Sequence, residues 1–271
     1  MIRGIVFDLF DTLVDQDPTR LAFVEHEGRR LSPSTVRLHA HLIRGGLHGI
    51  SLGDFAREQR QVDRELRAET LDRDLELPTL RRFEGLASRL GLADREGLTQ
   101  AWTRIHMDVL REALTVPTHH EAVLATLAGE HRLALCSNFS HGETARAILA
   151  ERGLDRHLSS IIVSEEVGFR KPRPEIFASV ADSLGLAPRE MLHVGDDLRA
   201  DVGGAARAGM RTVWLTRRIR DPEAELAAYE GPRPDFGLED LLDLPVLVAR
   251  LAGASGSNAG GSSVSGSSRA G

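Results

Sequence analysis

Short apolar segments that alternate with helical patterns constrain the fold of this chain more than any other feature. Continuous runs rich in valine, isoleucine and leucine occur at Ile2–Phe7, Leu133–Cys136, Ser160–Val163, Met191–Val194 and Thr212–Leu215. A continuous apolar run between polar residues is typical of a strand that is buried on both faces. Between the last four runs lie helical patterns at Glu143–Arg152, Pro174–Leu184 and Leu198–Ala208. Strands that alternate with helices in this way predict the α/β class, with a doubly wound parallel sheet.

The first two predicted strands are separated by more than a hundred residues whose patterns are almost wholly helical. Helices are predicted at Ser32–Ile43, Leu52–Ala68, Leu77–Leu90 and Asp94–Ala113. We therefore expect an α/β core made of residues 1–14 and 115–252, with a helical cap of residues 15–114 inserted into it. An insertion at this point would cover the carboxyl ends of the strands, where open α/β sheets bind ligands.

The C-terminal part of the chain is expected to change character near residue 253. A weaker apolar run near Asp235–Phe236 and a helical pattern at Leu238–Leu251 are expected to complete the core. Beyond them, residues 253–271 contain six glycines and seven serines and almost no apolar side chain. Burial of such a segment cannot offset the entropy lost on ordering, so this tail is predicted to be disordered.

Composition excludes several classes of protein. No apolar run approaches the roughly 20 residues of a membrane helix, and the single cysteine, Cys136, excludes an intrachain disulfide and fits a reducing cytoplasm. The formal net charge of −6 argues against nucleic acid as a partner, because a phosphate backbone requires a concentrated positive surface. We expect a cytoplasmic monomer or homodimer that acts on a small-molecule substrate and binds neither nucleic acid nor membrane.

Chemically reactive side chains follow the predicted strands, at the edge of the sheet where ligands bind. The first strand is followed by Asp8–Leu9–Phe10–Asp11–Thr12, the second by Ser137–Asn138, and the fourth by Gly195–Asp196–Asp197, with Asp201 shortly after. Between the third and fourth strands stands Lys171, the one lysine among 34 lysine and arginine residues. In a chain that otherwise uses arginine, this position is expected to need the compact ammonium charge.

In their order and spacing, these four motifs resemble those of the haloacid dehalogenase-like (HAD) hydrolase superfamily, in the subgroup with a helical cap between motifs one and two. The resemblance extends over roughly residues 1–250 and implies a Rossmann-like core. It implies that Asp8 is the nucleophile and that Thr12, Ser137, Asn138 and Lys171 complete the catalytic set. A carboxylate at a strand end can form a covalent intermediate that water then resolves, and a lysine beside it screens the repulsion between anionic oxygens.

The acidic residues of the fourth motif predict a metal ion. Asp196, Asp197 and Asp201 place three carboxylates within six residues, where they would repel one another without a cation. A hard divalent ion, Mg²⁺ by preference, relieves this repulsion with oxygen ligands. The resemblance implies a metal site of Asp8, the backbone carbonyl of Phe10, Asp196 as a direct ligand and Asp201 as the acid that orients the ion's waters or Lys171. Asp197 is left open between metal coordination and a helix N-cap.

The sequence departs from the family's phosphatases at Phe10, where they usually carry a second aspartate that serves as general acid and base. A phenyl ring cannot move a proton, and Asp11, one residue further along an extended segment, is expected to face the other way. Loss of general acid–base catalysis typically lowers the rate by about 10² to 10⁴.

Three functions remain open. The leading hypothesis is a Mg²⁺-dependent phosphatase that acts on a small phosphorylated metabolite through a phospho-aspartate at Asp8. The first alternative is a 2-haloacid dehalogenase with the same nucleophile, since those enzymes have an aromatic residue at the position of Phe10. They usually lack the acidic cluster of motif four, however, and carry tyrosine where this chain has Phe177. The second alternative is a binding or regulatory protein that kept the fold and has low turnover.

Other polar and aromatic side chains are assigned mainly to surface or core. The cap histidines His39, His41 and His48 are expected on a solvated helix face, with substrate binding or proton donation as the alternative. His119 and His120 are expected at the surface, pointing apart, and the arginines Arg217, Arg218 and Arg220 are expected to be solvated. Trp102, Trp214 and Cys136 are predicted to be buried in the core.

Overall fold

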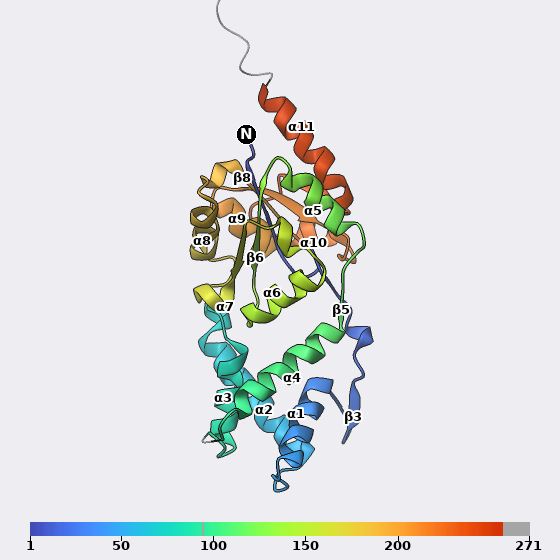
Figure 1. Cartoon of the computed structure of the whole chain (residues 1–271), viewed down its shortest axis with the longest axis vertical. Helices are drawn as coiled ribbons and strands as arrows, with labels where there is room; N and C mark the ends of the chain where they lie inside the picture. The colour runs from blue at the N-terminus through green and yellow to red at the C-terminus, as the bar shows by residue number, and fades with distance from the viewer. Residues whose placement is uncertain (94, 257–271) are drawn as a thin grey trace, which may run out of the picture.

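The computed structural model describes residues 1–93 and 95–256, and Figure 1 shows a sheet flanked by helices in its upper half and a group of helices in its lower half. Six strands form one sheet in the order β10-β9-β8-β1-β6-β7. Their bounds are Gly4–Phe7 (β1), Arg132–Ser137 (β6), Ser160–Val163 (β7), Met191–Gly195 (β8), Arg211–Leu215 (β9) and Phe236–Leu238 (β10). Every neighbouring pair in this sheet is parallel, which confirms the predicted class.

Helices cover both faces of the sheet, as a doubly wound fold requires. On β1, Ile5 and Phe7 enter one apolar cluster and Val6 enters a second, on the opposite face. The first cluster is completed by helices α5 (His120–Ala128), α6 (Gly142–Glu151) and α11 (Leu244–Gly256). The second is completed by α8 (Pro174–Leu184) and α9 (Gly204–Arg207). Two short helices, α7 (Ser164–Val167) and α10 (Pro222–Ala228), lie in the connections.

Four helices inserted between β1 and β6 form a group with its own apolar core. They are α1 (Pro33–Arg44), α2 (Leu52–Glu69), α3 (Thr79–Arg89) and α4 (Leu98–Glu112), and we refer to them as the cap helices. Phe55, Phe83 and the fully buried Trp102 lie at the centre of their cluster, with aromatic rings in edge-to-face contact. Ser32, the N-cap of α1, precedes a proline at the first helical position, the arrangement predicted for this helix start.

The interval between the first and second strands of the sheet is less uniformly helical than predicted. β2 (Asp15–Gln16) pairs with β5 (Leu114–Thr115), and β3 (Val24–His26) pairs with β4 (Arg29–Leu31), both antiparallel. Ladders of two or three residues are too short to give a readable alternation of polar and apolar side chains. The turn between β3 and β4 has positive φ at both Glu27 and Gly28, the geometry of a tight hairpin.

Several helix boundaries also differ from the sequence prediction. Helix α4 begins at Leu98 and not at Asp94, which lies outside the described residues, and α11 begins at Leu244 and not at Leu238. The segment Leu198–Gly203 is a π-helix that leads into α9, where one continuous α-helix was expected. Helix α11 continues to Gly256, so the predicted tail is helical over its first residues, 253–256; its remainder, 257–271, lies outside the described residues. In the part of the chain that the structure describes, no helix combines the length and apolar character needed to cross a bilayer.

Candidate active site

The carboxyl ends of the central strands bring the motif residues together. β1 lies between β6 and β8, and Phe7 is in register with Leu135 and Val194. The next residue, Asp8, therefore leaves the sheet beside the ends of both neighbouring strands, and its backbone N–H donates to the carbonyl of Val194 at 2.9 Å. This edge faces the cap helices, which lie beneath it in Figure 1.

Lys171 is the centre of the charge arrangement. Its Nζ donates to Asp8 Oδ1 at 2.5 Å, to Asp201 Oδ1 at 2.7 Å and to the Cys136 carbonyl at 2.7 Å. The side chain is 2% exposed. Burial alone would lower the pKa of this ammonium, but Asp201 and Asp8 raise it above its ordinary value, so Lys171 is held in its charged form.

Asp201 is fixed on both carboxylate oxygens. Oδ1 accepts from Lys171 and from His193 Nε2 at 2.9 Å, while Oδ2 accepts from the Asp197 N–H at 3.1 Å. Burial opposes ionisation here, yet the Lys171 charge and these hydrogen bonds hold the pKa of Asp201 below its ordinary value. Gly195 leaves the room for this carboxylate, since a Cβ at that position would lie 2.3 Å from Asp201 Cγ.

Three carboxylates approach closely enough to share one cation. Ligand atoms of Asp8, Asp196 and Asp201 all lie within 4.8 Å of one another. Burial and mutual repulsion raise the pKa of Asp8 to about 7 and that of Asp196 to about 8, with Lys171 only partly opposing. A bound divalent cation would remove this cost, so the donor set fits a hard metal ion. The Phe10 carbonyl accepts no hydrogen bond among the described residues, which leaves its oxygen available as well.

Asp197, left open from the sequence, lies outside this carboxylate group. One of its oxygens accepts from the backbone N–H groups of Arg199 at 2.8 Å and Ala200 at 2.7 Å. The side chain therefore caps the π-helix that begins at Leu198.

Two hydroxyl groups near Asp8 are buried without a partner. Thr12 and Ser137 are 0% exposed, and neither Oγ1 of Thr12 nor Oγ of Ser137 makes a hydrogen bond within residues 1–93 and 95–256. A buried hydroxyl without a protein partner gains a hydrogen bond when an anionic oxygen of a ligand accepts from it. Asn138 has a different place: its side chain accepts from the Lys171 N–H at 2.7 Å and donates to the Lys171 carbonyl at 3.0 Å. It holds the backbone that carries Lys171.

No carboxylate stands two residues after Asp8, where Phe10 lies, and the carboxylate of Asp11 is held by other residues. The Phe10 ring meets the Phe139 ring edge to face at 5.0 Å. Asp11 has a left-handed backbone with φ of 57°, accepts from the Gln16 N–H at 3.0 Å and pairs with Arg218 Nε at 3.4 Å. Its carboxylate is thus engaged by neighbours on its own side of the loop.

Two sequence expectations for surface residues are wrong. Arg217 is only 20% exposed and forms an ion pair with Asp15, whereas Arg218, which pairs with Asp11, and Arg220 are exposed as expected. His120 is fully buried, with Nδ1 in a hydrogen bond to the Leu13 carbonyl at 2.9 Å. These contacts join segments far apart in the chain, which local patterns cannot register.

The predictions of buried residues are confirmed. Trp102, Trp214 and Cys136 are at most 3% exposed. Among the cap histidines, His39 bonds to the Ile50 carbonyl and His48 is exposed.

Sequence reasoning missed two polar residues that organise the site. His193, in β8, is 1% exposed and burial lowers its pKa, so a neutral ring supports Asp201. Glu76, in the link between α2 and α3, is also buried; it accepts from Arg170 Nη1 at 2.6 Å and from Ser164 Oγ. Ser164 in turn accepts from the Phe139 N–H at 2.9 Å. A single polar residue inside an otherwise apolar strand or link gives no sequence signal of such distant partners.

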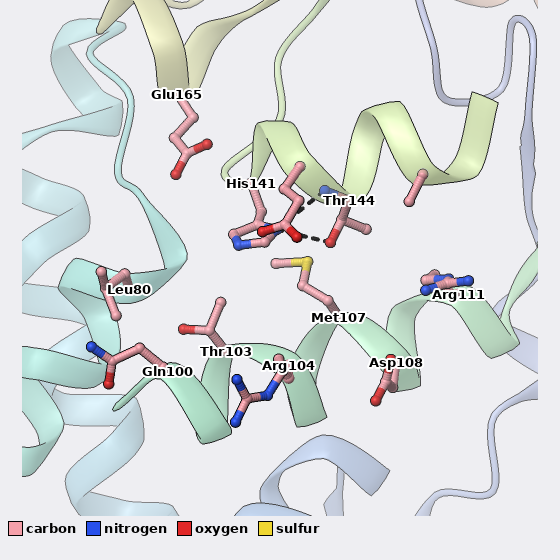
Figure 2. Close-up of a pocket in the computed structure, with 12 residues that line it drawn as sticks. Leu80, Gln100, Thr103, Arg104, Met107, Asp108, Arg111, His141, Thr144 and Glu165 are labelled. Atoms are coloured by element: carbon pink, nitrogen blue, oxygen red, sulfur yellow. Dashed lines mark hydrogen bonds between the residues drawn. The ribbon is translucent and has the colours of Figure 1, made fainter. Parts of the chain in front are cut away.

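Two cavities lie between the cap helices and the core. The larger, of about 460 Å³, separates α4 from α6; Figure 2 shows it between Met107 and the hydrogen-bonded pair His141 and Thr144. No motif residue lines it. The smaller, of about 270 Å³, is lined on the core side by Phe10, two residues after Asp8, and by Asn138, which directly follows Ser137. The smaller cavity is therefore the candidate site for the organic part of a substrate.

Comparisons with known proteins agree with this geometry. A family model described as haloacid dehalogenase-like hydrolase matches residues 2–209. The phosphoserine phosphatase of Thermus thermophilus is 32% identical over 167 residues, which cover 60% of this chain and 64% of that protein, less than two thirds of its length. The glyceraldehyde 3-phosphate phosphatase of Methanopyrus kandleri is 29% identical over 93% of this chain and 99% of its own. A crystal structure of the 2-haloacid dehalogenase from Pseudomonas syringae pv. Tomato DC3000 has a TM-score of 0.67 at 21% identity, covering 93% of this chain and 100% of that one, and shows the same fold.

Proposed function

Because the chain belongs to the haloacid dehalogenase-like hydrolase family, we propose that it is a Mg²⁺-dependent phosphatase that acts on a small phosphorylated metabolite through Asp8. One juxtaposition carries the proposal: three carboxylates within 4.8 Å of one another lie beside a buried lysine, and two buried hydroxyls nearby lack partners. This set offers a nucleophile, a cation site and donors for anionic oxygens. The similarity to two phosphatases over much of the chain supports the same conclusion.

The metal would be held by the carboxylates of Asp8 and Asp196 and by the Phe10 carbonyl. Both oxygens of Asp201 already accept hydrogen bonds, so this residue supports the site mainly by holding Lys171. When bound, Mg²⁺ would offset the negative charge that otherwise keeps a phosphate away from Asp8.

The reaction follows from the position of Asp8. Lys171 bonds Oδ1, so Oδ2 is the oxygen directed to the substrate. Oδ2 attacks phosphorus, the bond from phosphorus to the ester oxygen breaks, and the leaving alkoxide takes up a proton to form the alcohol. Thr12 and Ser137 would donate to the phosphoryl oxygens, whose charge Lys171 also offsets. Water then attacks the phosphorus of the acyl phosphate, which releases inorganic phosphate and a proton and restores the carboxylate.

The second candidate, dehalogenation, is favoured by Phe10. Halide leaves without a proton, so the absence of an acid at this position would carry no penalty. Asp8 would attack the carbon that bears the halogen, and water would hydrolyse the resulting ester. The carboxylate group at Asp8, Asp196 and Asp201 favours the phosphatase, because displacement of halide has no phosphate charge to offset.

A substrate panel with and without Mg²⁺ tests the proposal. We expect release of phosphate from small phosphate esters, dependence on Mg²⁺, and complete loss with a chelator. Asp8→Asn should lower turnover by a factor on the order of 10³ or more without loss of thermal stability, since an amide is a poor nucleophile. Asp72→Asn, an exposed acid in the link after α2, is the matched control and should retain full activity. If the protein releases halide from 2-haloacids in the presence of the chelator and releases no phosphate from esters, the phosphatase proposal is contradicted and dehalogenation is supported.

A further inference from the structure

We propose that Arg67, in the last turn of α2, recognises an anionic group on the organic part of the substrate, so that the preferred ester carries a carboxylate or a second phosphate. The inference rests on the proposed function, because it assigns the leaving group of the same reaction. It is carried by the small cavity between the cap helices and the core.

The cavity lies next to the loops that carry the proposed nucleophile Asp8 and the hydroxyl of Ser137. On the core side it is lined by Phe10 and Asn138, which follow Asp8 and Ser137 in the chain. On the opposite side it is closed by side chains of the inserted segment, among them Leu71, Leu77 and Leu110. An ester whose phosphate lies at Asp8 has its organic part directed into this space. At about 270 Å³ the cavity is slightly smaller than the roughly 300 Å³ at which small-molecule sites begin. It therefore suits a compact group.

The charges that line the cavity are predominantly positive. Arg67, Arg82 and Arg170 line it together with one carboxylate, Glu76. A cation at the wall of a partly enclosed cavity attracts an anion more strongly than the same cation in open solvent.

Two of the three arginines are already neutralised. Arg82 donates from Nε and Nη2 to both oxygens of Asp63, at 2.9 and 2.8 Å. Arg170 Nη1 donates to Glu76 at 2.6 Å, and the same carboxylate accepts from Ser164 and from the Leu77 N–H.

Arg67 differs from both. Its guanidinium has no carboxylate partner in the described ranges, and its side chain is exposed. Arg67 is thus the lining cation whose five donors are available to a ligand. A planar guanidinium matches a carboxylate or phosphate through paired hydrogen bonds, which defines the class of group expected.

A matched pair of esters isolates this contribution. In 4-(carboxymethyl)phenyl phosphate and 4-(carbamoylmethyl)phenyl phosphate the leaving groups have nearly the same shape and the same phenol acidity, and they differ in charge. We expect wild-type protein with Mg²⁺ to hydrolyse the carboxylate with kcat/KM at least about tenfold higher, mainly through a lower KM, as one charge-assisted hydrogen bond predicts. Arg67→Gln should abolish the preference and lower the rate with the carbamoyl ester much less than that with the carboxylate, while Arg67→Lys should restore part of the preference. Arg64→Gln, an exposed arginine on the same helix that does not line the cavity, is the control and should behave as wild type.

Binding without turnover separates this inference from the proposed function. Calorimetric titration with 4-carboxybenzylphosphonate and its carbamoyl analogue gives the same comparison with ligands that are not hydrolysed. A carboxylate preference that Arg67→Gln leaves intact, or its absence in wild type, would overturn the role of Arg67. Absence of hydrolysis of both esters, with an Arg67-dependent preference in the titration, would overturn the phosphatase and retain the anion site.

Discussion

At the scale of single residues, Phe10 sets the chemistry of this site apart from that of a phosphatase with a motif-one acid. Its ring packs against Phe139 and against the main apolar cluster of the core. Asp11 cannot easily take over the missing role, because its left-handed backbone and its contacts with Gln16 and Arg218 hold the carboxylate in place. The leaving group must then depart with little protonation from motif one.

This absence predicts a steep dependence on the leaving group. Aryl phosphates such as p-nitrophenyl phosphate, whose leaving groups need little protonation, should react well, and the rate should fall as leaving-group pKa rises. Phe10→Asp should flatten this dependence by restoring a proton donor, at a cost in stability, because a carboxylate would replace a packed ring. Single-turnover rates across a series of aryl and alkyl phosphates measure the slope. A flat wild-type slope in those measurements would show that another group donates the proton.

At the scale of elements, the link between α2 and α3 connects the cap helices to the loops that carry the proposed catalytic residues. The Glu76 side chain is 1% exposed and bonds Arg170, the residue before Lys171. Asp74 accepts from the Arg170 N–H through its carbonyl and pairs with Arg199 through its carboxylate at 2.8 Å. The Thr79 N–H donates to the Ser140 carbonyl at 3.0 Å. One short segment thus contacts the loops of motifs two, three and four.

Removal of the Glu76 charge should loosen this contact. Glu76→Gln leaves the half-buried guanidinium of Arg170 without a countercharge, and we expect a loss of about 1 to 3 kcal/mol in the free energy of unfolding. Turnover of p-nitrophenyl phosphate should fall as well, because the loop of Lys171 is less well fixed. Denaturant unfolding and steady-state kinetics measure the two effects. Glu84→Gln, at an exposed position of α3, is the control; equal behaviour of the two variants would refute this role.

His106, on α4, should make the stability depend on acid pH. Burial, together with the Arg82 charge, lowers its pKa to about 4 from an ordinary value of 6.5, although Asp63 opposes the shift. The folded state then disfavours protonation, so the contribution of this group to stability is complete above about pH 6.5 and is lost as the pH falls towards 4. We expect a loss of roughly 1 to 3 kcal/mol over this window. Melting curves from pH 7 to 4 should show a shallower decline for His106→Gln, and parallel curves would contradict the assignment.

The sequence was most informative where local patterns determine the structure. The parallel strands were predicted because continuous apolar runs have few other uses, and the positions of Asp8, Ser137 and Asp196 at strand ends follow from the geometry of a parallel sheet. Glu76 and Arg170 are 94 residues apart. Contacts of that kind depend on how the cap helices dock, which no local pattern encodes, and the same holds for the unexpected burial of His120.

At the scale of the whole molecule, the structure has two apolar cores, one around the sheet and one among the cap helices. The carboxylates of Asp8, Asp196 and Asp201 lie close together at the sheet edge between these cores. Their mutual repulsion therefore lowers the stability of the folded chain. Asp8 and Asp196 both have raised pKa values, a sign of destabilising burial.

Mg²⁺ should therefore stabilise the folded protein as well as support turnover. We expect millimolar Mg²⁺ to raise the melting temperature by a few degrees over the chelated protein, because a ligand that binds only the folded state adds its binding free energy. Asp196→Asn should reduce this increment and the affinity for Mg²⁺ together. A melting temperature of wild-type protein that does not respond to Mg²⁺ would show that the site does not bind this ion.

The two points at which the chain leaves and re-enters the sheet-bearing half are adjacent. Asp15 pairs with Thr115 and Gln16 with Leu114, so the ends of the inserted segment are hydrogen-bonded neighbours. Because the ends of this segment already touch, a longer, shorter or different segment can take its place. The conformational entropy lost when the chain folds then changes little. Evolution can therefore replace the whole insert by another, as a module grafted at one junction, and so change what the enzyme accepts without disturbing the sheet that performs the chemistry.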